Sequence, residues 1–374
     1  MKKVVVAGCL CLDITPEFHD SREGEKKSAA EWFLPGKLMQ VGEASIHTGG
    51  AVANTGLAFR HFGADVSLMG KVGDDAFGKL VLDLLDRHGG RQGAAVSKDC
   101  STAYTVVLAP PGIDRIFFHN PGANDVFGLD DLDFEEIAQA DLFHLGYPTI
   151  MRRMFEHPDE LVEIFSRVKE LGVKTSLDLT AIEEDSDAAK ADWPALLQEL
   201  LPKVDFFVPS AEEICFLIDR DRYDQWMERA SGGDLTEYLE IENDIRPLAD
   251  RLLTWGAGIV LIKCGIKGLY LKTGKSQELP ESWQDIELFE PSYQAERVRS
   301  ATGAGDVSIA AFLTALLEGK EPGRCLSLAA AAGACCVTEY DSLSGLLTME
   351  EMEEKIDQGW EKNNSPVSEY LEPE

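Results

Sequence analysis

The stretch Ala301-Thr302-Gly303-Ala304-Gly305-Asp306, followed by the apolar run 307–317, decides how the rest of the chain is interpreted. Glycine and alanine have almost no side chain, so the backbone N–H groups of residues 303–305 can approach a ligand closely. The spacing of the apolar run predicts a helix, whose first N–H groups and dipole favour an anion. Asp306 would repel that anion, so its better use is as a general base. An ordinary glycine turn at a helix start is the structural alternative.

A second glycine-rich stretch, Gly49-Gly50-Ala51-Val52-Ala53-Asn54, opens another predicted helix. The glycine pair permits close approach of a ligand to the backbone, and Asn54 can donate and accept hydrogen bonds to hydroxyls. Asp13 follows the first apolar run, where a parallel strand would end and where open α/β sheets bind ligands. Its carboxylate suits two adjacent sugar hydroxyls. A glycine turn with a polar helical residue is the alternative for residues 49–54.

Short apolar runs alternate with helical patterns along most of the chain. The runs that predict buried strands are 4–7, 66–69, 142–145, 175–177, 206–208 and 259–262. The helical patterns between them include 54–62, 77–88, 160–171 and 246–255. This alternation predicts an α/β fold with a doubly wound, mostly parallel central sheet that is flanked by helices.

Four segments depart from that rhythm. Residues 101–124 alternate like strands around a Pro-Pro-Gly turn and predict a β-hairpin. We expect this hairpin and the polar segment 14–48 to form a small β lid. Residues 219–245 and 350–374 are acidic and are interpreted as a surface insertion and a tail. The chain 1–374 would then be a single domain with these additions.

Composition excludes some classes of function. The chain has 374 residues with 35 Lys+Arg against 66 Asp+Glu, a net charge of −31. This charge disfavours nucleic acids and anionic membranes as partners. No apolar run is long enough for a membrane span, and the first run is broken by polar residues, which favours a strand over a signal peptide. The eight cysteines form no C-x-x-C pair, as expected of reduced thiols in a cytoplasmic protein.

Taken together, the two glycine-rich stretches resemble the signatures of the ribokinase-like (PfkB-type) carbohydrate kinase family. Residues 49–78, from Gly49-Gly50 to Gly73-Asp74-Asp75, are similar to its N-terminal signature, and Thr302-Gly303-Ala304-Gly305-Asp306 to its C-terminal one. Pro121-Gly122-Ala123-Asn124, after the hairpin, also fits. The resemblance implies a ribokinase-like fold with a β lid. It also implies transfer of the ATP γ-phosphoryl, with Mg²⁺, to a primary hydroxyl of a sugar.

The resemblance further implies roles for individual residues. Asp306 would be the general base, and the amides of Gly303, Ala304 and Gly305 the anion hole. Substrate hydroxyls would bind Asp13, Gly49, Gly50 and Asn54, and the nucleotide would contact Lys263, Gly265 and Gly268. Ser210 and Glu213 stand where the family has its N-x-x-E motif, with Glu213 reaching Mg²⁺ through water. Ser300 replaces an aspartate that shapes a monovalent-cation site in the family, so a K⁺ site is not carried over.

Three alternatives to a sugar kinase are compatible with the sequence. A nucleoside kinase of the same fold would stack a base on lid aromatics, for which Trp32, Phe33, Phe117 and Phe118 are candidates. A catalytically silent regulatory or binding relative would not need the intact 303–306 stretch. A vitamin kinase would often lack a separate lid. Whatever the substrate, an open sheet edge in the lid favours a homodimer.

Overall fold

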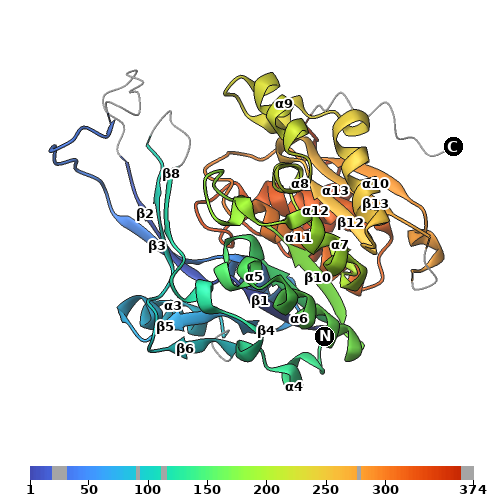
Figure 1. The fold of residues 1–374 in the computed structure, drawn as a ribbon. Helices are drawn as coiled ribbons and strands as arrows, with labels where there is room; N and C mark the ends of the chain where they lie inside the picture. The colour runs from blue at the N-terminus through green and yellow to red at the C-terminus, as the bar shows by residue number, and fades with distance from the viewer. Residues whose placement is uncertain (19–31, 90–92, 111–115, 276–278, 364–374) are drawn as a thin grey trace.

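An eight-stranded sheet forms the centre of the molecule, with strand order β14-β13-β12-β11-β10-β9-β1-β4. The computed structural model describes residues 1–18, 32–89, 93–110, 116–275 and 279–363 (Figure 1). The strands are β1 (Lys3–Gly8), β4 (Asp65–Met69), β9 (Leu142–Gly146), β10 (Lys174–Asp178), β11 (Phe206–Phe207), β12 (Ile259–Lys263), β13 (Gly268–Thr273) and β14 (Glu287–Pro291). All pair in parallel except β13 and β14, which add antiparallel to one edge. The predicted doubly wound, mostly parallel sheet is confirmed.

Helices cover both faces of this sheet, and each face has its own apolar core. The helices of the first face are α2 (Ala51–His61), α3 (Ala76–Arg87), α11 (Ala304–Leu317) and α12 (Pro322–Cys336). Those of the second are α6 (Pro158–Glu170), α7 (Trp193–Leu200), α8 (Ala211–Ile218) and α10 (Arg246–Thr254), with the short α4 (Phe134–Ile137) and α5 (Arg152–Glu156) beside them.

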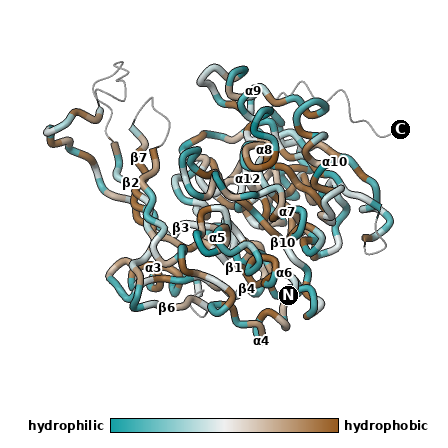
Figure 2. Tube along the Cα trace, viewed as in Figure 1, coloured by the Kyte–Doolittle hydropathy of each residue, from teal (hydrophilic) through white to brown (hydrophobic). Residues whose placement is uncertain are grey.

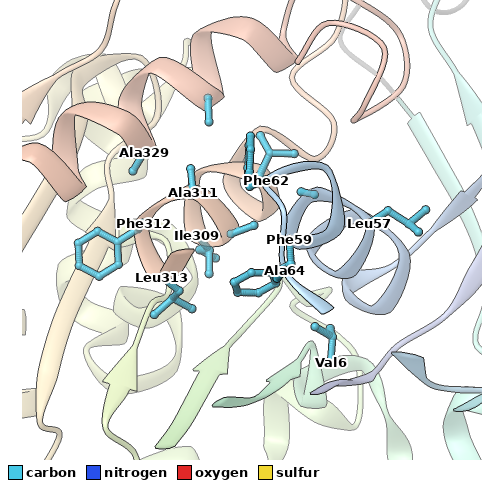
Figure 3. Packing of buried hydrophobic residues seen from close by; sticks show 14 of the residues in the cluster. Val6, Leu57, Phe59, Phe62, Ala64, Ile309, Ala311, Phe312, Leu313 and Ala329 are labelled. Atoms are coloured by element: carbon cyan, nitrogen blue, oxygen red, sulfur yellow. The ribbon is translucent and has the colours of Figure 1, made fainter. Parts of the chain in front are cut away.

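Alternation along each strand explains the two cores. In β1, Val4 and Val6 belong to the first core, whereas Val5 and Ala7 belong to the second, because successive side chains point to opposite faces. Figure 3 shows the first core from close by, where side chains of α11 such as Ile309 lie beside residues of α2. Packing of α11 on α2 fixes the relative position of the two glycine-rich helix starts.

A second, four-stranded sheet has the order β3-β2-β7-β8. Its strands are β2 (Cys11–Pro16), β3 (Ala44–Gly49), β7 (Tyr104–Leu108) and β8 (Ile116–Asn120), and in Figure 1 they project from the helix-covered part of the molecule. Two short strands, β5 (Lys71–Gly73) and β6 (Ala95–Ser97), pair separately. β3, β7 and β8 come from the segments predicted to form the β lid, whereas β2 begins at Cys11, three residues before the first of these segments. Residues 19–31 of the first segment and most of the predicted hairpin turn, 111–115, lie outside the described residues.

The acidic segment 219–245 packs against the rest of the protein. It contains α9 (Arg220–Ala230), in which Trp226 is buried and donates a 2.8 Å hydrogen bond to Asp244. Figure 2 shows hydrophobic and hydrophilic positions interleaved along this part of the chain. The C-terminal segment contains α13 (Met349–Asp357), and its residues 364–374 lie outside the described part. Within the described ranges, every helix is too short or too polar to cross a membrane.

Candidate functional site

Polar side chains gather where four neighbouring parallel strands end. Tyr147 follows β9, Asp178 ends β10, Ser210 lies just after β11 and Lys263 ends β12. The carboxyl ends of parallel strands meet at one edge of the sheet, where open α/β folds bind their ligands. The start of α11 with Asp306 reaches the same edge, since the hydroxyl of Tyr147 contacts Asp306.

The carboxylate of Asp306 is buried, with an exposed fraction of 2%, and accepts three hydrogen bonds. Thr55 Oγ1 donates to Oδ1 at 2.8 Å, while Asn54 Nδ2 and Tyr147 Oη donate to Oδ2 at 3.1 Å and 2.7 Å. These three donors fix the orientation of the carboxylate. Asp306 and Asn54, which sequence analysis assigned to one site, are thus in direct contact.

Asn54 connects this carboxylate to an open cavity. Its Oδ1 accepts a 3.1 Å hydrogen bond from Ser342 Oγ. Asn54 also lines a cavity of about 400 Å³ between the four-stranded sheet and the segment before α11. The other lining residues are Asp13, Thr15, His47, Thr48, Val107, Ala109, Val298, Arg299, Ser300, Ala301, Thr302, Tyr340, Asp341 and Ser342. The lining is rich in hydroxyl, carboxylate and amide groups, which suits a polar ligand of small size.

Asp13 lines this cavity from β2, with its carboxylate next to Gly49 of β3. Burial raises the pKa of Asp13, and hydrogen bonds from Cys11 and Thr105 partly offset that increase. Any side chain at Gly49 would overlap the Asp13 carboxylate, so a glycine is required there. Gly50 has a φ of 81° and precedes α2, a conformation that favours glycine. Asp13 and Asn54 therefore line the cavity, and the glycine pair lies directly behind them at the junction of β3 and α2.

The ammonium of Lys263 lies between a buried carboxylate and the start of α11. Lys263 Nζ is 2.7 Å from Asp178 Oδ1, and their side chains are 12% and 0% exposed. A Cβ atom at Gly305 would be 3.2 Å from Lys263 Cδ, so the lysine side chain runs alongside the predicted anion hole. Burial alone would lower the pKa of Lys263, but Asp178 and Glu213 raise it, and the ammonium stays charged.

Ser210 and Glu213 form a capping box at the start of α8. Ser210 N donates to Glu213 Oε2 at 2.7 Å, and Glu213 N donates to Ser210 Oγ at 3.2 Å. Burial raises the pKa of Glu213, while Lys263 and the hydrogen bond from Ser210 oppose that rise. The Ser210 hydroxyl thus has a structural role, and the Glu213 carboxylate lies within electrostatic reach of Lys263.

Gly265 and Gly268 flank the turn that follows β12. Both have positive φ, 56° and 126°, and substitution at either would produce a clash, with Thr236 and with Glu290 respectively. Thr236 belongs to the acidic segment, so that segment packs against the turn. These two glycines belong to the loop beyond Lys263 and are not in the Asp306 cluster.

The donor set fits a phosphate and a magnesium ion bound largely through that phosphate. Gly303 has a φ of 76° and starts α11, so the amides of Ala304 and Gly305 lie in the first turn next to Lys263. Within the described ranges, no three His, Cys, Asp or Glu side chains are grouped as a metal site would require. Mg²⁺ is usually held by one or two carboxylates together with substrate phosphates, which agrees with a single candidate, Glu213.

Sequence analysis missed four residues of this site: Tyr147, Asp178, Thr55 and Ser342. Asp178 and Tyr147 could have been found, because Asp178 ends a strand of the central sheet, as Lys263 does, and Tyr147 directly follows one. Thr55 and Ser342 gave no such signal. Thr55 looks like an ordinary helical residue, and Ser342 reaches Asn54 across 288 positions of sequence.

Known proteins are similar to this chain in both sequence and fold. The family model described as "pfkB family carbohydrate kinase" matches residues 21–349. Fructokinase-2 of Oryza sativa subsp. japonica is 24% identical over 321 residues, 82% of this chain and 84% of the relative.

Two solved structures have the same fold. The Arabidopsis thaliana ribokinase complexed with ribose and ATP matches with a TM-score of 0.68 and 23% identity, covering 94% of this chain and 97% of that one. A protein from E. coli provisionally named ribokinase II, in complex with ATP and Mg²⁺, matches with a TM-score of 0.69 and 20% identity, covering 96% and 100%.

Proposed function

Because the chain belongs to the pfkB family of carbohydrate kinases, we propose that Asp306, Asn54, Asp13 and Lys263 make one active site for phosphorylating a sugar hydroxyl with ATP. The observation that carries the proposal is the contact between Asn54 and Asp306. Asn54 lines the polar cavity on one side and donates to the buried carboxylate on the other. A sugar in the cavity would therefore lie next to a group that can accept its proton.

The chain's own residues would perform distinct tasks in this reaction. Asp13 and Asn54 would bind hydroxyls of the sugar and orient it, with the backbone of Gly49 and Gly50 close by. Asp306 would accept the proton of the attacking hydroxyl. Since Asp306 is only 2% exposed, the hydroxyl must replace one of its donors, and Asn54, on the cavity side, is the donor that can turn toward the sugar.

Lys263 and the first amides of α11 would bind the phosphate that is transferred. An ammonium and backbone N–H groups beside Gly305 are suited to stabilising charge that develops on a phosphoryl group. When bound, ATP would supply the phosphoryl group and Mg²⁺ would offset its negative charge, and Glu213 would hold the ion through water. The four-stranded sheet would exclude water from the cavity as a lid.

The cavity favours a sugar over a nucleoside as the acceptor. Of the four lid aromatics that could stack on a base, Trp32, Phe33, Phe117 and Phe118, none is among the cavity-lining residues. Tyr340 is the aromatic side chain in that set, and its neighbours are mostly polar or charged. A cavity lined by polar groups, without two aromatic side chains between which a base could stack, suits the hydroxyls of a sugar better than the faces of a base.

The test is a panel assay of ATP turnover with free sugars, sugar phosphates and nucleosides as acceptors. We expect strong turnover with one sugar or sugar phosphate, no response to nucleosides, and loss of turnover when EDTA removes Mg²⁺. A strong response to nucleosides alone would favour a nucleoside kinase. No turnover of any acceptor would favour a silent binding protein, and calorimetric titration with ATP would then measure whether the nucleotide still binds.

A further inference from the structure

The backbone of Tyr147 adopts an unusual conformation at the edge of the proposed active site. Its φ and ψ are 67° and 37°, the left-handed region that residues with side chains seldom enter. Pro148 follows and normally restricts the preceding residue to extended conformations. The two other described non-glycine residues with positive φ, Ser231 and Asp285, are exposed residues in turns or loops, whereas Tyr147 is half-buried. Strain of this kind persists where the surrounding structure enforces it, and it gathers at functional sites.

Contacts on both sides of Tyr147 enforce this conformation. Tyr147 N donates to the carbonyl of Asp178 at 3.1 Å. Two residues further on, Thr149 Oγ1 donates to the carbonyl of Thr180 at 2.8 Å, and Thr180 N donates back to Thr149 Oγ1 at 3.1 Å. The turn after β9 is thus bound to the end of β10, and this arrangement directs the tyrosine side chain toward α11.

The hydroxyl of Tyr147 donates the shortest of the three hydrogen bonds to Asp306, at 2.7 Å. Burial raises the pKa of Tyr147 well above its usual value, and Asp306 raises it further, so the hydroxyl keeps its proton and stays a donor. Thr55, fully buried, holds Oδ1. Asn54 makes the longest of the three bonds and is the donor that lines the cavity.

We propose that Tyr147 is a positioning residue, which holds Oδ2 of Asp306 in place while Asn54 turns from that oxygen to the substrate. The proposal rests on the proposed function, in which Asp306 is the base. Once Asn54 has turned away, Oδ2 has one position free, and the attacking hydroxyl can donate to it. Tyr147 and Thr55 then keep the carboxylate from rotating, so that the free position stays directed at the substrate.

Several other titratable groups lie near Asp306, and the substitution used in the test leaves those groups in place. The titratable groups within electrostatic range are Asp13, Tyr147, Asp178, Glu213, Lys263 and Cys336. A Tyr147→Phe variant leaves all but Tyr147 unchanged and keeps the ring that fills the space. Tyr293→Phe is the matched control, because the Tyr293 hydroxyl also donates to a carboxylate, Glu290 Oε1 at 3.2 Å, outside the Asp306 cluster.

The experiment measures kcat, KM and the pH dependence of kcat/KM with the sugar found in the panel assay. For Tyr147→Phe we expect kcat to fall about tenfold, which is the effect of losing one hydrogen bond to a charged group. The KM for the sugar and the KM for ATP should both stay within about twofold of wild type. We also expect the acid limb of the profile to move up by about one pH unit, because a carboxylate with fewer donors takes up a proton more readily. Tyr293→Phe should leave kcat, KM and the profile unchanged.

A merely structural role for Tyr147 would not move the acid limb. An unshifted limb together with a kcat within twofold of wild type would overturn the inference, provided that Asp306→Asn is inactive. If Tyr147→Phe fails to fold, Thr55→Val removes the other holding donor and must move the limb in the same direction. If Asp306→Asn keeps wild-type turnover, the assigned base is wrong, and the role of Tyr147 is overturned with it.

Discussion

Lys263 Nζ lies 2.7 Å from Asp178 Oδ1 at the ends of two neighbouring parallel strands, with the carboxylate fully buried. The pair brings a positive charge to the start of α11 that a lysine alone could not hold there, because an unpaired buried ammonium is costly. Asp178 Oδ2 is buried and has no hydrogen-bond partner among the described residues. The negative charge of the Asp178 carboxylate is therefore balanced by the ammonium of Lys263.

Removing only the lysine should destabilise the protein strongly. Lys263→Met leaves Asp178 buried without a partner, and we expect the free energy of unfolding to fall by about 3 kcal/mol. The double variant Asp178→Leu/Lys263→Met replaces the pair by apolar groups and should recover most of that loss without recovering turnover. Urea unfolding and the kinase assay measure the two effects. Equal stability of the single variant and wild type would contradict the importance of this pair.

Asp306→Asn should lower kcat by at least about 10²-fold, the smaller end of the effect of losing a general base. Asparagine keeps the shape, and its single side-chain oxygen can still accept a hydrogen bond from either Thr55 or Tyr147, so the fold should survive. Near wild-type turnover of the true substrate would refute the assignment of Asp306 as the base. Circular dichroism of the same preparation checks that the variant is folded.

The capping box at α8 should contribute to stability and also to nucleotide binding. Ser210→Ala removes the hydrogen bond to Glu213 N, and we expect it to lower the free energy of unfolding by about 1 kcal/mol. Thr348→Ala is the matched control, since Thr348 and Glu351 form the same box at α13. Only Ser210→Ala should raise the KM for MgATP, because only its box includes Glu213. An equal effect of both variants on that KM would argue against a role for Glu213 in binding MgATP.

His144 should make stability depend on pH. Burial and, to a smaller extent, the charge of Lys263 together lower its pKa from an ordinary value of 6.5 to about 3. Between those pH values the unfolded chain binds a proton that the folded protein does not. The stability that His144 contributes is therefore complete above about pH 6.5 and is lost as the pH falls, by about 1.4 kcal/mol per pH unit.

Urea unfolding between pH 6.5 and pH 4.5 tests this contribution. His144→Asn should lose less stability over that interval than wild type, and the difference should approach the slope of one proton. The same pH dependence in both proteins would mean that His144 is not the group responsible.

A homodimer through the four-stranded sheet remains a prediction. β8 is at the edge of that sheet, and Phe118 on it is 59% exposed. An unpaired strand edge with apolar side chains favours pairing with a second copy. Light scattering should give about twice the monomer mass of 41.1 kDa, and Phe118→Glu should halve it. A monomeric wild type at assay concentration would refute the dimer.

Much of the fold could be predicted because most strands of the central sheet contain a short apolar run that is buried where the strands pair, although β13 and β14 were not among the predicted strands. The 142–145 run is an example, since β9 covers Leu142–Gly146 and is buried throughout. The lid strands β7 and β8 could be predicted from the alternation in residues 101–124. Tyr147 could not be assigned, because its role depends on a left-handed backbone that contacts from β10 impose. Sequence spacing does not carry information of that kind.

The contact between Asn54 and Asp306 joins residues that are 252 positions apart, and Ser342 reaches Asn54 across 288. Every strand of the eight-stranded sheet precedes Gly303 in the chain. On the ribosome, the whole sheet is therefore synthesised before α11 and α12 can cover one of its faces. Contacts of such long range slow folding, and an uncovered apolar face is prone to aggregation. We therefore expect the nascent chain to pass through a stage in which part of this face is exposed, and the proposed active site to be among the last parts to form.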